Sequence, residues 1–141
     1  MGLFLLDVNV LLALAWSRHG AHDRVGRWFA HHSQSGWATC PFTQAGFVRI
    51  LSNPAFSRDA LSPQAALAVL EANLKLPGHS FWPDSIAVPE AISYVEHKLT
   101  GHRQVTDAYL LGLAIHRGGK LATMDEGVAA MAPKGVVEAV R

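Results

Sequence analysis

The chain has 141 residues, a length typical of one domain. Half of its residues are apolar and only 16% are charged, which excludes a disordered chain and provides for a sizeable buried core. The formal net charge is +1, so the chain as a whole carries no polybasic field that would attract nucleic acid. We therefore expect a single domain over residues 1–141.

Cysteine usage and the N-terminal segment bear on where the protein works. The chain has one cysteine, Cys40, which excludes an internal disulfide and fits a reducing compartment. Residues 1–16 are apolar, but they lack a basic leader and are interrupted by Asp7. No stretch approaches the ~20 apolar residues that a membrane span requires. These features predict a cytoplasmic protein with no membrane segment.

Short apolar segments alternate with helical patterns along the chain. Strands are expected, in chain order, at residues 3–6, 37–40, 79–82, 121–124 and 135–140. Helices are expected at residues 9–16, 19–32, 42–51, 63–76, 88–98 and 104–117. Ser62 is the predicted cap before the fourth helix, and Gly118 is predicted to close the last one. Such alternation is typical of an α/β fold, here a three-layer α/β/α sandwich around a central twisted parallel sheet.

Carboxylates are scarce in this chain, and three of them are predicted to meet. Asp7 and Asp125 each follow an expected strand directly, so they lie at the carboxyl edge of the sheet, where open α/β folds bind ligands. Asp107 lies in the first turn of the expected helix 104–117, which must run antiparallel to the strand that follows it. The start of that helix and the end of that strand therefore share one edge. Gln44 reaches the same edge from the start of helix 42–51.

Three aspartates at one edge repel one another, and a divalent cation relieves that repulsion. Oxygen ligands alone favour Mg²⁺ or Mn²⁺ over zinc. A cation held in this way suits metal-assisted hydrolysis of a phosphodiester bond. The alternative for each aspartate is a purely structural role, as a helix cap or as a charge that complements a helix dipole.

Four segments of the chain resemble the motifs of PIN-domain ribonucleases and, more narrowly, of the VapC toxins of type II toxin–antitoxin modules. The segments are Leu-Leu-Asp-Val-Asn-Val-Leu-Leu-Ala (residues 5–13), Thr-Gln-Ala-Gly-Phe-Val-Arg-Ile-Leu-Ser-Asn-Pro (43–54), Thr-Asp-Ala-Tyr-Leu-Leu (106–111) and Leu-Ala-Thr-Met-Asp (121–125). They occur in the order and spacing of the family, and the resemblance spans essentially the whole chain. A single aspartate after an apolar run would be weak evidence, whereas the ordered set is specific.

The resemblance implies an endoribonuclease that depends on Mg²⁺ or Mn²⁺ and acts as the toxin of a VapBC-type module. It also implies a homodimer, an RNA substrate and a cognate VapB-type antitoxin whose C-terminal segment occupies the active-site groove. By position, Asp7, Asp107 and Asp125 would be the catalytic metal-site residues. Asn9 and Thr43 would be their polar neighbours.

One position departs from the family pattern. The family commonly has Glu where this chain has Gln44, and the amide lacks both the negative charge and the ability to accept a proton. Gln44 could still ligate a cation or orient a water through its amide oxygen. The alternative function is therefore a PIN-fold binding module whose catalysis is weakened or lost.

Two arginines and one rival enzyme class complete the sequence-based expectations. Arg49 and Arg103 are candidates for contact with an RNA phosphate or an antitoxin carboxylate, and an ordinary exposed arginine is the alternative for each. A phosphatase of the haloacid-dehalogenase type would use Asp7 as its nucleophile. That class needs a second aspartate two residues later, where this chain has Asn9, so it is disfavoured.

Overall fold

Five short strands form a single sheet in which every neighbouring pair runs parallel. The computed structural model describes residues 3–141. The strands are β1 (Phe4–Leu6), β2 (Trp37–Thr39), β3 (His79–Phe81), β4 (Lys120–Thr123) and β5 (Val137–Ala139). All five predicted strands are confirmed, each shorter than or equal in length to the segment expected from the sequence. Their order across the sheet is β3-β2-β1-β4-β5.

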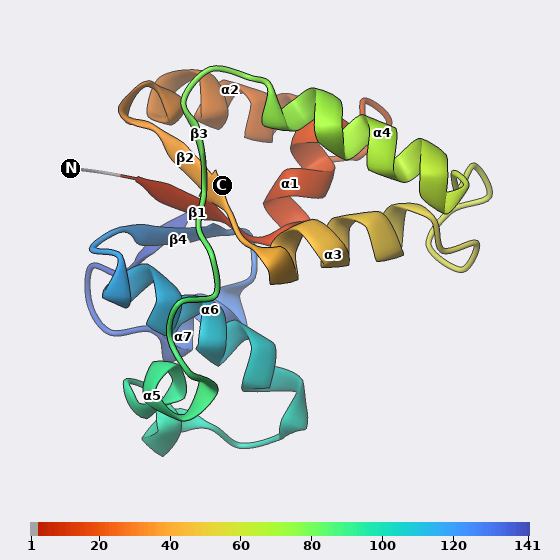
Figure 1. Ribbon diagram of the computed structural model, residues 1–141. Coiled ribbons are helices and arrows are strands. Elements are labelled where there is room, and N and C mark those ends of the chain that lie inside the picture. Colours follow the sequence, from red (N-terminus) through yellow and green to blue (C-terminus); the bar gives the residue numbers. More distant parts are fainter. Residues whose placement is uncertain (1–2) are drawn as a thin grey trace.

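Helices cover both faces of the sheet and complete the three predicted layers (Figure 1). On one face lie α1 (Val8–Ala15), α2 (His22–His32), α3 (Pro41–Leu51) and α4 (Pro63–Leu74). On the other lie α5 (Val88–Ser93), α6 (Val105–His116) and α7 (Glu126–Met131). Short 3₁₀ turns occur at Ser33–Ser35, Glu96–Lys98 and His102–Gln104. The predicted α/β/α sandwich is confirmed.

The strand order reverses direction at β1. The chain first moves outward from β1 to β2 and β3, and then returns to add β4 and β5 on the other side of β1. Crossovers on the two sides of such a reversal leave a crevice outside the carboxyl ends of the two strands that flank it. In this sheet the crevice lies beyond the ends of β1 and β4, the two strands that Asp7 and Asp125 follow.

The core consists of two clusters, one on each face of the sheet, because side chains alternate along every strand. In β1, Phe4 and Leu6 pack with α1 and α2, whereas Leu5 packs against α6. All three side chains are buried. Both faces of the strand are apolar, which is why the parallel sheet is recognisable in the sequence as continuous apolar runs.

Ten of the twelve predicted helix ends lie within two residues of the observed ends, whereas α2 begins at His22, three residues later than expected. Two local signals are confirmed. The Ser62 hydroxyl accepts a hydrogen bond from the Ala65 backbone N–H at the start of α4. Gly118 adopts a positive φ of 68° after α6, a conformation that L side chains rarely adopt.

Two other helices differ from the prediction. The helix expected at 88–98 ends at Ser93, and a 3₁₀ turn follows, because Val95 leaves the helical region with φ −132° and is buried in the core below α6. The six-residue helix α7 was not predicted, since it is too short for a helical period to be visible. No helix within residues 3–141 is long and apolar enough to cross a lipid bilayer.

Candidate active site

Three elements place an aspartate at the carboxyl edge of the sheet. Asp7 joins β1 to α1 and is the N-cap of that helix. Asp125 follows β4 and is the N-cap of α7. Asp107 lies in the first turn of α6, the helix that leads into β4. The three aspartates differ in depth: Asp7 is buried, Asp107 is half-buried and Asp125 is exposed.

Asp7 is the most firmly held of the three. Its side chain is only 7% exposed, one carboxylate oxygen accepts from the Val8 backbone N–H at 2.8 Å, and the other accepts from the Thr123 hydroxyl at 2.6 Å. Its own backbone N–H donates to the Ala122 carbonyl at 2.9 Å, which ties it to β4. Burial raises the pKa of Asp7, these two hydrogen bonds lower it, and the charge of Asp125 adds a smaller increase.

Thr123 organises this part of the site, although the sequence analysis did not single it out. Its buried hydroxyl donates to Asp7 and accepts from the Asn9 side-chain amide at 3.3 Å and from the Asp125 backbone N–H at 3.0 Å. The Asn9 amide oxygen in turn accepts from the Met124 backbone N–H at 3.2 Å. Asn9 thus lies beside the aspartates and is joined to Asp7 through Thr123. The sequence carried no signal for the role of Thr123, because threonine is a common β-branched strand residue.

Asp125 also makes local hydrogen bonds that fix its carboxylate. One oxygen accepts from the backbone N–H of Gly127 at 2.8 Å and of Val128 at 3.3 Å. Asp7 and Asp125 therefore carry the capping role that was the structural alternative for each. Capping uses only part of a carboxylate, which has two oxygens and about four lone-pair sites.

Asp107 differs, because no group within residues 3–141 donates a hydrogen bond to its carboxylate or forms an ion pair with it. Its pKa is raised from 3.8 to about 6, chiefly by burial and then by the charges of Asp7 and Asp125. Because the charges of Asp7 and Asp125 both contribute to this increase, Asp107 lies near the other two carboxylates.

The chemistry of these donors fits a hard divalent cation. The donors are carboxylate oxygens, and burial first and then the charges of the other two carboxylates raise the pKa of Asp107; a bound cation would offset that repulsion. In the described part of the chain, no three His, Cys, Asp or Glu side chains form a group that could hold a metal ion. Mg²⁺ is typically held by one or two carboxylates and retains several waters, so it does not require three protein ligands.

The first turn of α3 holds Gln44 at the same edge, next to β2. Its amide nitrogen donates to the Thr39 hydroxyl at 2.9 Å, and that hydroxyl lies 2.7 Å from His79 Nε2. Burial lowers the pKa of His79. The Gln44 amide oxygen has no hydrogen-bond donor within residues 3–141, so it is free to accept from a ligand or a water.

Thr43 is positioned differently from its predicted place beside the aspartates. Its buried hydroxyl accepts from the Cys40 backbone N–H at 3.0 Å and donates to the Cys40 carbonyl at 3.1 Å. These contacts form a capping box at the start of α3. Thr43 therefore orients the helix that carries Gln44, and its hydroxyl is not directed at the acidic side chains.

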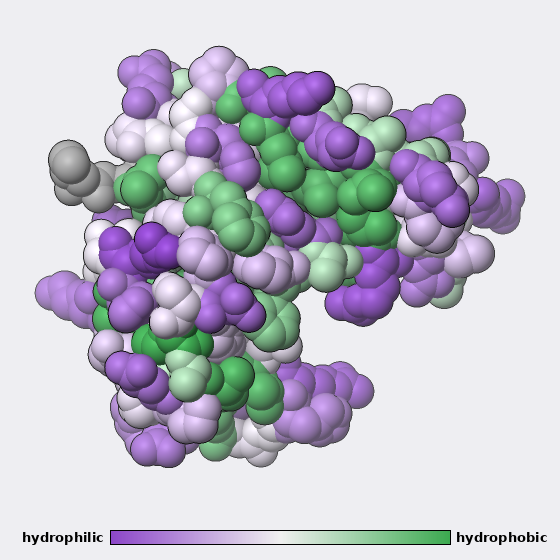
Figure 2. Space-filling view, viewed as in Figure 1, coloured by the Kyte–Doolittle hydropathy of each residue, from purple (hydrophilic) through white to green (hydrophobic). Residues whose placement is uncertain are grey.

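A groove runs beside the aspartates, between α3 and the start of α6. In Figure 2 the surface is hollowed at the right, between the part formed by α3 above and the part formed by α6 below. Val8 and Thr106 line the groove, and each is the chain neighbour of a site aspartate. Arg49 also lines it. Arg103 lies outside it, exposed in the 3₁₀ turn before α6.

Residues 4–134 match the family profile of the PIN domain. The chain belongs to the PIN-domain family. Two ribonucleases of Mycobacterium tuberculosis are similar over nearly their full length. Ribonuclease VapC39 is 44% identical over 95% of this chain and 96% of its own length, and ribonuclease VapC38 is 45% identical over 95% of each. Within the PIN-domain family, the chain therefore belongs with the VapC ribonucleases, as its motifs indicated.

Two solved structures with the same fold are of VapBC proteins bound to DNA. A chain of VapBC2 from Rickettsia felis, bound to a DNA fragment from its promoter, superposes with a TM-score of 0.70 at 12% identity and covers 99% of each chain. A chain of DNA-bound VapBC from Salmonella typhimurium gives the same TM-score at 16% identity over the whole of both chains. At these identities the likeness establishes the PIN fold alone.

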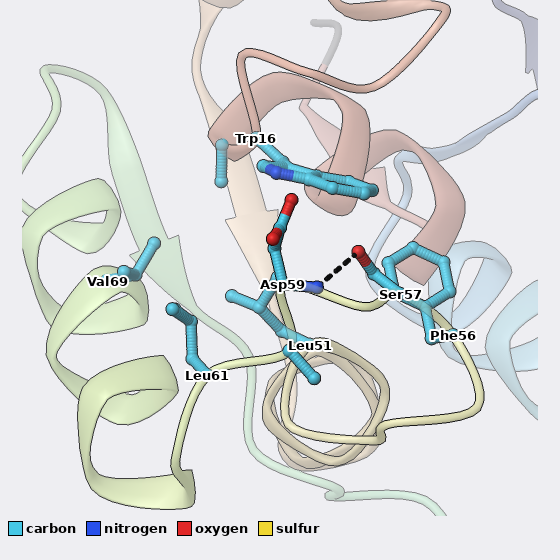
Figure 3. A pocket seen from close by; sticks show the side chains of 9 residues that line it. Trp16, Leu51, Phe56, Ser57, Asp59, Leu61 and Val69 are labelled. Carbon is cyan, nitrogen blue, oxygen red and sulfur yellow. Dashed lines mark hydrogen bonds between the residues drawn. The ribbon is translucent and has the colours of Figure 1, made fainter.

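A second pocket of this PIN domain lies at the far end of α1, away from the aspartates (Figure 3). Its walls are largely apolar and include Trp16, Leu51, Phe56 and Leu61. The Ser57 hydroxyl in this pocket accepts from the Asp59 backbone N–H at 3.1 Å, and the Asp59 carboxylate pairs with the exposed Arg18. Because its one carboxylate is neutralised by that ion pair, the pocket offers no acid–base or metal chemistry.

Proposed function

We propose that this VapC-family protein is a toxin that hydrolyses phosphodiester bonds in cytoplasmic RNA with the help of Mg²⁺ or Mn²⁺. The observation that carries the proposal is the mutual electrostatic influence of Asp7, Asp107 and Asp125, which come from three separate parts of the chain to one crevice. A structural role explains the capping carboxylates but leaves Asp107 without an internal partner. The names of the VapC relatives, all ribonucleases, support the same activity.

The roles of the residues follow from how each is held. Asp7 and Asp125 are fixed by hydrogen bonds, so they offer their remaining lone pairs to a cation at constant positions. When bound, the cation neutralises charge on the attacked phosphate and lowers the pKa of a water molecule. Asp107 is unpaired, and its carboxylate would face the cation, orient the attacking water and, once it has lost its own proton, accept one from that water. The Gln44 amide oxygen is a further acceptor at the same edge.

Phosphate contacts position an RNA without reading its sequence. The Arg49 guanidinium in the groove supplies such a contact next to the acids. The formal net charge of the chain is only +1, so this local arrangement of charge matters more than the overall balance. Arg103 on the rim before α6 is a second, more peripheral contact.

Partners are proposed by analogy with the structural neighbours, which are VapBC complexes. We expect a VapB-type antitoxin to inhibit the enzyme by placing a segment over the same crevice. We also expect a homodimer. Co-purification with the antitoxin and sedimentation of the toxin alone test these two expectations separately.

Incubation of the purified protein with a structured RNA tests the activity. Cleavage is expected in Mg²⁺ or Mn²⁺, none in EDTA, and full recovery once the cation is restored. Equal cleavage in EDTA would contradict a role for the cation. Binding of RNA without cleavage in either cation would favour the alternative of a PIN-fold binding module that lost its chemistry at Gln44.

A further inference from the structure

The groove beside the aspartates has the size and lining of a nucleotide site. Its volume is about 430 Å³, within the range of small-molecule pockets. Two of its lining residues, Val8 and Thr106, are the chain neighbours of Asp7 and Asp107, so a ligand in the groove would lie beside the proposed cleavage site. Its other walls combine an aromatic ring, a cation and an anion: Phe42, Arg49 and Asp84.

Phe42 is an exposed ring with a rigid support. It lies in the first turn of α3 and is 43% exposed, although it is a large apolar side chain. Its ring packs against Tyr109 of α6, with ring centroids 5.0 Å apart and planes inclined by 52°. Tyr109 is itself buried, and its hydroxyl donates to the Ile86 carbonyl at 3.3 Å. Phe42 is therefore held in place and can serve as a stacking surface for a base.

The two charged walls of the groove are opposite in sign, yet they do not neutralise each other. Within residues 3–141, neither Arg49 nor Asp84 forms an ion pair or a side-chain hydrogen bond. The Arg49 guanidinium lies over Gly46, where a Cβ atom would come within 3.9 Å of Nη2. Asp84 lies on the side of Tyr109: burial raises the pKa of the Tyr109 hydroxyl, and the charge of Asp84 raises it further. Both groups are thus available to a ligand.

Each wall matches one part of a nucleotide. An aromatic face stacks on any base, and a guanidinium binds phosphate oxygens. A carboxylate only accepts hydrogen bonds and can receive two at once. Guanine is the one standard base whose Watson–Crick edge presents two adjacent N–H donors, at N1 and at the exocyclic amine. Unpaired bases are read on such edges in single-stranded RNA.

We propose that this groove binds one unpaired guanine nucleotide next to the scissile phosphate, stacked on Phe42, with its phosphate on Arg49 and its Watson–Crick edge on Asp84. The proposal rests on the proposed ribonuclease function and adds a preference for the base beside the cut. Asp84 would be the residue that determines specificity, whereas Phe42 and Arg49 would bind any nucleotide.

Fluorescence anisotropy with labelled RNA hexamers in EDTA measures this binding without cleavage. The probes are a uridine hexamer, the same hexamer with one central guanosine, and a third with inosine, which lacks the exocyclic amine. The wild-type protein is expected to bind the guanosine hexamer at least fivefold more tightly than the other two. Equal affinities for the three probes would overturn the assignment of guanine.

Matched variants separate the three walls. Phe42→Ala should weaken binding of all hexamers about tenfold and Phe42→Trp should preserve it, because stacking is sequence-tolerant. Phe56→Ala, which removes another exposed ring on the chain, should change nothing. Asp84→Asn should reduce the guanosine preference to less than twofold, whereas Glu71→Gln should leave it intact. Arg49→Ala should weaken all hexamers alike and make binding less sensitive to salt.

The outcomes distinguish this proposal from the function on which it rests. Cation-dependent cleavage with unchanged hexamer binding in Phe42→Ala and Asp84→Asn would overturn the guanine site and leave the ribonuclease intact. If Phe42→Ala shifts the sedimentation coefficient and leaves hexamer binding unchanged, the groove is a contact between copies of the chain, and the proposal fails. Loss of the guanosine preference in Asp84→Asn alone would support it directly.

Discussion

The site has two parts that are built differently. Asp7 and Asp125 belong to a hydrogen-bonded network centred on Thr123, and each also caps a helix. Asp107 projects into the same crevice from α6 and has no hydrogen-bond or ion-pair partner within residues 3–141. The fold therefore fixes two carboxylates through hydrogen bonds that also stabilise helix starts. It leaves the third carboxylate available to a cation or another ligand.

This difference separates structure from function within one cluster. Removing a fixed carboxylate disturbs a helix start as well as the chemistry, so a loss of activity in such a variant has two possible causes. Removing the free carboxylate relieves repulsion in the empty site and damages only the chemistry. The two parts consequently respond to substitution with opposite signs in stability, and the following variants exploit that contrast.

Asp107→Asn should produce the largest effect. We expect RNA cleavage to fall about 10³-fold, because a group that orients water and accepts its proton is lost. The cation-free protein should become more stable by about 1 kcal/mol at pH 7.5, since a partly desolvated charge is removed and screening by water limits the gain. Cleavage rates and urea denaturation in EDTA measure the two effects.

The control for this variant is Glu126→Gln, a neighbouring acid on the exposed side of α7. Its cleavage rate should stay within twofold of the wild-type rate. Its free energy of unfolding should stay within about 0.5 kcal/mol of the wild-type value. A destabilised Asp107→Asn would contradict the view that this carboxylate has no structural role.

Thr123→Val should break the fixed part of the site while preserving its shape. The buried Asp7 carboxylate loses a hydrogen bond, and the Asn9 amide and Asp125 N–H lose their acceptor, so we expect destabilisation of about 2 kcal/mol. Thr100→Val, at an exposed threonine, should cost less than about 0.5 kcal/mol. Equal unfolding midpoints for the two variants would contradict a central role of Thr123 in the hydrogen-bonded network.

Gln44→Glu tests the departure of this chain from the family pattern. A carboxylate can still bond to the Thr39 hydroxyl, now as the acceptor, and it adds a negative charge near the cation. We expect Mn²⁺ affinity to rise about fivefold, with faster cleavage, even at an effective dielectric near 20. Gln64→Glu makes the same chemical change in the first turn of α4 and should have no effect. Unchanged affinity in Gln44→Glu would mean that residue 44 does not face the cation.

The pH dependence of stability should carry a small signature of Asp107. Its pKa is about 6 in the folded chain against 3.8 in the unfolded one, so the folded state binds more protons between these values. Its contribution to stability is therefore full below pH 3.8 and is lost as the pH rises through 6. The free energy of unfolding in EDTA should fall by about 1 kcal/mol more in the wild type than in Asp107→Asn between pH 4.5 and 7.5, after allowance for screening. A parallel pH dependence would contradict the raised pKa.

Much of this arrangement could be predicted from the sequence, because it depends on chain topology. Apolar runs marked the central strands β1 and β4, and the lengths of α6 and β4 were enough to bring Asp107 to the edge where Asp125 lies. Such arguments need only the rise per residue of helices and strands. The same reasoning put Gln44 at this edge.

The directions of individual side chains could not be predicted in this way. Thr43 was expected beside the aspartates, yet its hydroxyl caps α3, because a threonine three residues after the cap finds backbone partners within reach. Thr123 was overlooked, since a threonine within a buried strand is indistinguishable by pattern from an ordinary β-branched residue. Helix α7, whose start fixes Asp125, is too short to show a period.

Proton release on cation binding tests most directly whether the unpaired Asp107 carboxylate faces the bound divalent ion. Titration calorimetry of Mn²⁺ at pH 6, repeated in buffers of different ionisation enthalpy, measures the number of protons released. Because the pKa of Asp107 is about 6, we expect the wild type to release about half a proton per ion bound and Asp107→Asn to release almost none. Mn²⁺ binding with equal affinity and equal proton release in both proteins would contradict the account.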